Sequence, residues 1–184
     1  MRLLLLLALS ACAAHKSPET EVAPVLAVLD TTPTPYTAEQ LRDAIPVGTE
    51  MRFRLTMADG TRLISTTEFI AADAVNTTYR QTMRSEDGAV VAGPTESSAA
   101  WTELRDHAAF LLDKTQIEQL SVTTELGTFE AWLYTVQVDE ELLGPQVQRY
   151  WFAKDLAGPP VLLTVEVDGQ EVERMEMISR SGLD

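Results

Sequence analysis

Long runs of alternating apolar and polar residues, separated by Asp-Gly pairs, most constrain how this chain can fold. From Met51 to Met57, every second residue is apolar and the residues between them are polar. A period of two is typical of a strand with one buried face. An Asp-Gly pair between two such runs favours a tight hairpin, and the chain has three: Asp59-Gly60, Asp87-Gly88 and Asp168-Gly169. The pattern therefore predicts antiparallel strands joined by short turns.

The alternating runs fall into two groups. The first predicts four strands in a meander over residues 49–92, which ends where Gly93-Pro94 breaks the pattern. The second predicts later strands at residues 117–126, 129–138, 146–153, 161–167 and 170–178. Residues 129–138 are apolar on both faces, which indicates a strand that is covered on both sides.

Two short helices are predicted beside the strands. Thr37 and Gln40 fit a capping box at the start of a helix that runs to Ile45, and Pro46 ends it. Ser98 is expected to cap a second helix, in which the apolar residues recur at helical spacing: Trp101, Leu104, Ala108 and Leu111. The predicted fold class is mainly β (α+β), a single curved antiparallel sheet or half-barrel of about eight or nine strands with two short helices.

Residues 1–11 have the layout of a secretory signal peptide, with one positive charge, an apolar run and small residues at the end. The run from Leu3 to Ala11 would extend roughly 14 Å as a helix, which is too short to cross a hydrocarbon layer of about 30 Å. The sequence therefore predicts export without a permanent membrane span in this segment. Cys12, which follows directly, is the only cysteine in the chain.

Leu9-Ser10-Ala11-Cys12 resembles the lipobox of bacterial lipoproteins at all four positions. The resemblance implies that the signal peptide is removed before Cys12 and that its thiol carries the acyl chains of a lipid anchor. Two or three chains give durable attachment, because a single chain binds a membrane only marginally. By the sorting rule for enteric lipoproteins, Asp directly after the lipidated cysteine keeps a lipoprotein in the inner membrane. Ala13 stands at that position here, which implies the outer membrane, facing the periplasm. The alternative is a plain secretory signal that is cut nearby and leaves Cys12 unmodified.

Residues 12–36 are predicted to be an extended tether between the lipidated cysteine and the domain. Neither helical nor strand periodicity is sustained there, and the segment holds four of the nine prolines: Pro18, Pro24, Pro33 and Pro35. Residues 37–184 show no internal repeat and no change of composition that would mark a second domain. A single β-rich domain is therefore predicted over this range.

Composition excludes several partners and cofactors. The chain has 28 acidic and 14 basic residues, a net charge of −14, which would repel the phosphates of a nucleic acid. One cysteine and two histidines leave no route to an intramolecular disulfide, a thiolate zinc site or an iron–sulfur cluster. We therefore expect no metal, no cofactor and no nucleic-acid partner.

One pair of residues has a spacing that suits acid–base chemistry. Glu103 and His107 are four residues apart in the second predicted helix, where they would be neighbours. Charged residues also occur on the exposed face of any amphipathic helix, and no Gly-x-Ser-x-Gly, His-Glu-x-x-His or Ser-x-x-Lys motif accompanies the histidine. We therefore expect a protein that is not an enzyme, and a hydrolase that uses His107 is the alternative.

Aromatic residues are the candidate ligand contacts. On the concave face of a curved sheet they could hold acyl chains or an apolar peptide, and the candidates are Trp101, Trp132, Tyr134, Tyr150, Trp151 and Phe152. The competing interpretation is that these side chains form the core, which a domain of this size needs in order to fold.

Two further resemblances bear on function. The predicted strand order, the helix insertion and the Gly158-Pro159-Pro160 loop are similar to the half-barrel carriers that move lipoproteins through the periplasm. That resemblance implies a carrier of lipid or acyl chains in a concave apolar pocket. Residues 101–110 and 150–161 resemble uncharacterised lipoproteins of Gram-negative bacteria, which implies no function. The sequence favours a lipid-anchored envelope protein with a non-catalytic binding or structural role, with an envelope protein or a lipid as partner, and the carrier is the alternative.

Overall fold

The computed structural model describes residues 30–140 and 144–181. The predicted signal peptide, Cys12 and most of the tether lie outside the described residues. The helices are α1 (Ala38–Ala44), α2 (Trp101–Asp106) and one 3-10 turn, η1 (Leu112–Lys114). The strands are β1 (Glu50–Met57), β2 (Arg62–Ala72), β3 (Asn76–Ser85), β4 (Val90–Ala100), β5 (Thr115–Thr124), β6 (Gly127–Glu140), β7 (Gly144–Ala153), β8 (Leu162–Val167) and β9 (Gln170–Arg180).

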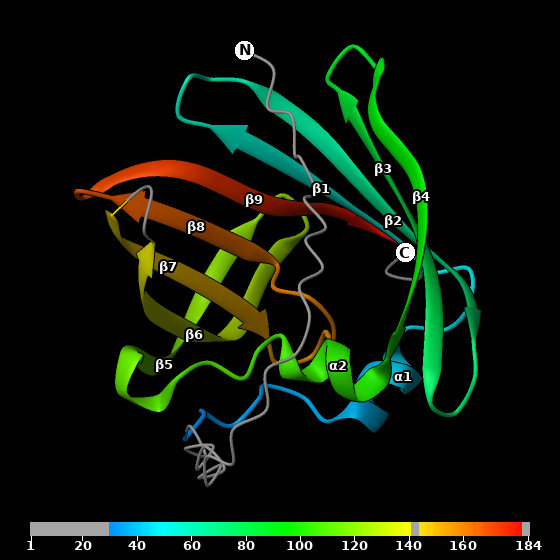
Figure 1. Ribbon diagram of the computed structural model, residues 1–184, viewed down its shortest axis with the longest axis horizontal. Helices are drawn as coiled ribbons and strands as arrows, with labels where there is room; N and C mark the ends of the chain where they lie inside the picture. Colours follow the sequence, from blue (N-terminus) through cyan, green and yellow to red (C-terminus); the bar gives the residue numbers. More distant parts are fainter. Residues whose placement is uncertain (1–29, 141–143, 182–184) are drawn as a thin grey trace, which may run out of the picture.

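The strands form one open antiparallel sheet in the order β4-β3-β2-β1-β9-β8-β7-β6-β5. Two meanders, β1–β4 and β5–β9, are joined by the pairing of β1 with β9, which runs from Met51 opposite Arg180 to Met57 opposite Glu173. The sheet is strongly curved, and α1 and α2 lie across its opening (Figure 1). The predicted fold class, a mainly β protein with one curved antiparallel sheet and two short helices, is confirmed.

Strand β4 is longer than the sequence predicts. It does not end at Gly93-Pro94 but continues to Ala100, with a register shift between Gln81 and Met83 of the paired strand. β4 is an edge strand, and Pro94 lies within the register shift and has no paired residue on β3, two positions at which a strand tolerates proline. Gly93 has a φ of +81°, and a Cβ there would lie 2.5 Å from the Gln81 carbonyl oxygen. Gly93 and Pro94, which the sequence predicts to end the strand, are thus accommodated in a β-bulge, and the strand continues beyond them.

The start of α2 also differs from the prediction. Ser98 lies within β4, and the N-cap is Ala100. An alanine side chain cannot accept a hydrogen bond, and the Glu103 carboxylate accepts the Ala100 N–H instead, at 2.7 Å. The expected cap at Ser98 is therefore wrong, and the helix ends at Asp106, before Ala108 and Leu111.

Helix α1 begins where the sequence predicts it. Gln40 N–H donates to the Thr37 hydroxyl at 3.2 Å, and Thr37 N–H donates to the Gln40 side-chain oxygen at 2.8 Å, which completes the capping box. Residues 30–36, which the sequence assigns to the tether, pack against the domain. Thr31 pairs with Leu111, and Tyr36 is 5% exposed in the core.

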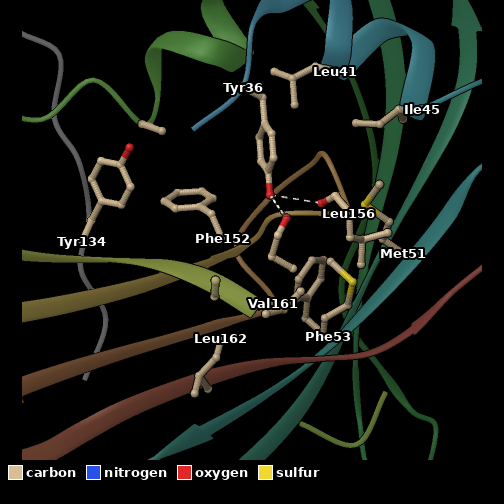
Figure 2. Packing of buried hydrophobic residues seen from close by; sticks show 14 of the residues in the cluster. Tyr36, Leu41, Ile45, Met51, Phe53, Tyr134, Phe152, Leu156, Val161 and Leu162 are labelled. Carbon is tan, nitrogen blue, oxygen red and sulfur yellow. Dashed lines mark hydrogen bonds between the residues drawn. The ribbon is translucent and has the colours of Figure 1, made fainter. Parts of the chain in front are cut away.

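The core lies between the concave face of the sheet and the two helices (Figure 2). Tyr36 points down from the helix side, and its hydroxyl donates to the carbonyls of Ala153 and, at 3.2 Å, Leu156. Burial raises the pKa of Tyr36 well above its ordinary value. On β6, Leu133 and Tyr134 are both buried although they point to opposite faces, as the apolar pattern of that segment predicts.

Candidate ligand-binding cavity

A cavity of about 390 Å³ lies under the helices, on the concave face of the sheet. Its lining is mainly apolar. The floor comes from strands β1, β2, β3 and β9, with large side chains from Met51, Phe53, Phe69, Tyr79 and Met175. The roof comes from α1 and the α2 region, with Leu41, Ile45, Leu104 and Ala108.

Strand register explains why this part of the concave face is not filled. Met51 lies opposite Thr67, and Phe53 lies opposite Ser65, on the face that lines the cavity. At these two positions a large side chain of β1 is paired with a small one of β2, and the small side chains leave volume above them.

Arg180 holds the roof to the sheet. It is 7% exposed at the end of β9, and its guanidinium donates to Ala44 O at 2.5 Å and to Ala157 O at 3.0 Å. The Ala44 carbonyl is among the last of α1, where a cation complements the helix dipole. Burial lowers the pKa of Arg180 from its ordinary value. One buried side chain therefore fixes the end of α1 and the loop after β7.

Two of the six candidate aromatic residues line the cavity. Tyr150 and Phe152 alternate with Trp151 on β7, so Trp151 points to the opposite face of the sheet. Burial raises the pKa of Tyr150, with a smaller contribution from Glu173. That these aromatic residues contact a ligand stays a prediction.

The other three candidates hold the structure together around the cavity and do not line it. Trp101 is buried, and its indole N–H donates to Asp73 O at 3.1 Å. Trp132 packs edge-on against Tyr36, with ring centroids 6.0 Å apart. The Tyr134 hydroxyl donates to Pro33 O at 2.8 Å.

The floor residues are not among the ligand contacts that the sequence predicts: Met51, Phe53, Phe69, Tyr79 and Met175. The alternation in β1 placed Met51 and Phe53 on one face, so the signal for a shared surface was present. Contacts between segments far apart in the chain determine how the helices cover that surface and how much space is left beneath them. Alternation within one strand does not reveal either.

The predicted acid–base pair is not assembled. His107 is exposed and lines the cavity, while the Glu103 carboxylate is bonded to the Ala100 N–H. Within the described residues, no hydrogen bond joins the two side chains, and no group of three or more His, Cys, Asp or Glu is placed to hold a metal ion. The helices in the described ranges are also too short or too polar to span a membrane.

The opposite face of β1–β3 is polar. A shallow hollow there is lined by Glu50, Arg52, Thr66, Glu68, Arg80, Thr82 and Arg84. Arg80 donates to Glu96 at 2.8 Å and to Glu68 at 3.2 Å, and all three side chains are about half exposed. The two faces of the same three strands therefore differ completely in chemistry.

Few known proteins are similar to this chain in sequence or structure. No family model and no curated protein matches the chain. Two solved structures resemble it at 13% sequence identity: the crystal structure of MucB (TM-score 0.49) and that of MucB in complex with MucA(peri) (TM-score 0.48). The matches cover 78% and 80% of this chain and 56% of MucB, so the chain spans about half the length of that protein. Similarity at this level carries no statement about function.

Proposed function

We propose that this protein is a non-catalytic binding protein of the bacterial cell envelope that holds an apolar chain, such as an acyl chain of a lipid, in the cavity. The cavity itself carries the proposal. Its 390 Å³ falls within the roughly 300–1,000 Å³ of small-molecule sites, and its lining is mainly apolar. At about 30 Å³ for each group the size of a water molecule, it holds about 13 such groups, which suits one acyl chain of medium length.

A non-catalytic role agrees with the polar groups near the cavity. Glu103 is occupied in capping α2, so His107 has no carboxylate partner there within the described residues. A purely structural or protein-binding role would leave the cavity empty. Ligand binding in the cavity is therefore the observation that separates a carrier from a scaffold.

The test uses two variants of adjacent residues on β2. Ser65 lines the cavity and Thr66 points to the opposite face, so Ser65→Phe fills the cavity and Thr66→Phe is the matched control. Native mass spectrometry of the purified chain should detect a bound acyl lipid in the wild type and in Thr66→Phe. We expect Ser65→Phe to lose it. Equal occupancy in both variants, with both folded, would contradict the proposal.

We further propose that Cys12 anchors the protein by covalent lipid, on the strength of the lipobox Leu9-Ser10-Ala11-Cys12. Cys12→Ala should move the protein from the membrane to the soluble fraction, and Ala14→Ser serves as a control that leaves the motif intact. Ala13→Asp should stay membrane-bound and, by the enteric rule, shift from the outer to the inner membrane. Membrane association of Cys12→Ala equal to that of the wild type would rule out the anchor.

A further inference from the structure

The charged residues that line the cavity are all basic. Apart from tyrosines, its ionisable side chains are Arg105 and His107, and no Asp or Glu of the described residues lines it. The chain as a whole has twice as many acidic as basic residues and a net charge of −14. A cavity lined in proportion to that composition would contain carboxylates, so their absence from the lining distinguishes this site from the rest of the surface.

Both basic residues are solvent-accessible parts of the lining, and we call this part of the cavity its opening. Arg105 is in the last turn of α2 and its side chain is 36% exposed, and the exposed His107 follows the end of the helix. The rest of the lining is mainly apolar, with Met51 and Phe53 on β1 both buried, and its other polar side chains, such as Ser65 and Thr67, are uncharged. The cavity is therefore amphipathic, with an apolar interior and a basic opening.

Arg105 has donors free for a ligand. Its Nε–H donates to Asp106 Oδ1 at 2.7 Å, and within the described residues neither terminal nitrogen has a hydrogen-bond partner. The acids whose charges act on Arg105 are Asp106 and Glu39, and neither lines the cavity. The two terminal NH2 groups of the guanidinium and the imidazole are thus available to an oxyanion at the opening, an arrangement that suits a carboxylate or a phosphate.

We infer that the ligand is an anionic amphiphile with one acyl chain, whose chain lies among the apolar floor residues and whose carboxylate or phosphate binds Arg105 and His107. This inference rests on the proposed function and adds the charge and orientation of the ligand. The overall field of a chain with charge −14 favours cations and repels anions. Selection of an anion would therefore have to come from the opening of the cavity.

The test compares four amphiphiles with the same dodecyl chain, below their micelle concentrations, by titration calorimetry. They are dodecanoate, dodecyl phosphate, the neutral dodecyl maltoside and the cationic dodecyltrimethylammonium. The protein is the full chain with Cys12→Ala, which has no thiol for covalent lipidation, after removal of any lipid that copurifies in the cavity. We expect at least one anion to bind about tenfold or more tightly than the neutral compound, and the cation to bind most weakly. The two anions distinguish a carboxylate from a phosphate head group.

Variants then assign the effect to the opening. Arg105→Gln should weaken binding of the preferred anion about tenfold and leave the neutral amphiphile within about twofold, and Arg105→Lys should restore much of the loss. Arg52→Gln removes an exposed arginine from the opposite face and is the matched control, with no expected effect.

The outcomes separate the inference from the proposed function. Equal binding of anionic and neutral amphiphiles, or equal losses in Arg105→Gln and Arg52→Gln, would overturn the inference and leave the acyl-binding function standing. Failure of all four amphiphiles to bind, together with no lipid on the purified wild type, would remove the proposed function and the inference with it.

Discussion

On β6 and β7, aromatic rings fill the concave face of the sheet, whereas on β1 and β2 the same face is left partly hollow. Tyr134 lies opposite Tyr150 and Trp132 lies opposite Phe152, so aromatic residues meet aromatic residues across this pair of strands. The rings of Tyr134 and Phe152 are 5.4 Å apart in an edge-on contact. In the other half, Phe53 meets Ser65 and Met51 meets Thr67.

The comparison indicates that cross-strand register contributes to where this sheet is filled: Ser65 and Thr67 leave space beside Phe53 and Met51, although Phe69 and Tyr79 form an aromatic pair in the same half. Both halves present apolar residues to the same side, but their covers differ. Tyr36 and Phe110, which lie outside the helices, pack against the rings of β6 and β7, whereas α1 and α2 lie over the cavity. Aromatic pairs and aromatic cover fill one half, and small partners under the helices leave space in the other.

The largest expected effect is the loss of an aromatic side chain from the filled half. Phe152 is 4% exposed and its ring contacts those of Tyr36, Tyr134 and Tyr150. Phe152→Ala should lower the free energy of unfolding by about 4 kcal/mol, because the truncated side chain leaves a void among rigid rings. Chemical denaturation measures this value. A loss below about 1 kcal/mol would mean that this half is no more tightly packed than the other.

Substitution by leucine should change the free energy of unfolding in opposite directions in the two halves. Val136 is 6% exposed on the same face of β6 as Tyr134, so Val136→Leu should cost about 1 kcal/mol through overpacking. Ser65→Leu projects into the cavity and should stabilise the unliganded protein by about 1 kcal/mol. Denaturation curves of both variants beside the wild type test the contrast. Destabilisation of similar size at both positions would remove it.

The smallest expected effect is on the pH dependence of stability, and it involves the turns of the first meander, β1–β4. Each hairpin of the first meander has an aspartate whose pKa is lowered by hydrogen bonds within the turn: Asp59, Asp73 and Asp87. For Asp73, the donors are the backbone N–H of Asn76 and then that of Val75, both at 2.7 Å. These carboxylates bind fewer protons in the folded than in the unfolded chain.

An aspartate whose pKa is lowered by folding stabilises the folded chain at pH values above the ordinary aspartate pKa, near about 4. This stabilisation is lost as the pH falls through the pKa that the aspartate has in the folded chain. Asp73→Asn keeps an acceptor oxygen but has no charge to lose. We therefore expect it to be less stable than the wild type at pH 7 and to differ less from it at pH 2. Thermal unfolding at both pH values measures the gap. A gap that widened on acidification would contradict this assignment.

Much of the fold follows from local signals. The alternation of apolar residues and the Asp-Gly pairs place the hairpins β1–β2, β3–β4 and β8–β9, and the capping box of Thr37 and Gln40 places α1. The extension of β4 through Gly93-Pro94 could not be read in this way, since proline ends a strand unless it lies at an edge or a bulge. Edge position is a property of the whole sheet.

The cavity was only partly predictable for the same reason. The sequence pointed to a concave apolar face and to Tyr150 and Phe152, but it also selected Trp101 and Tyr134, which support the surroundings of the cavity. Aromatic character indicates burial and does not distinguish a packed ring from a lining one. The sequence also does not predict the basic charge of the opening, because charged residues such as Arg105 and His107 occur on the exposed face of any amphipathic helix.

The sequence by itself determined the period of the strands, the positions of most turns and the start of α1, because these depend on interactions between residues a few positions apart. Only the tertiary structure decided that β1 pairs with β9, that Ser65 lies beneath the helices and that Arg105 lines a cavity to which the described residues contribute no carboxylate. Those features depend on register and packing between distant segments, for which a single sequence carries no local signal.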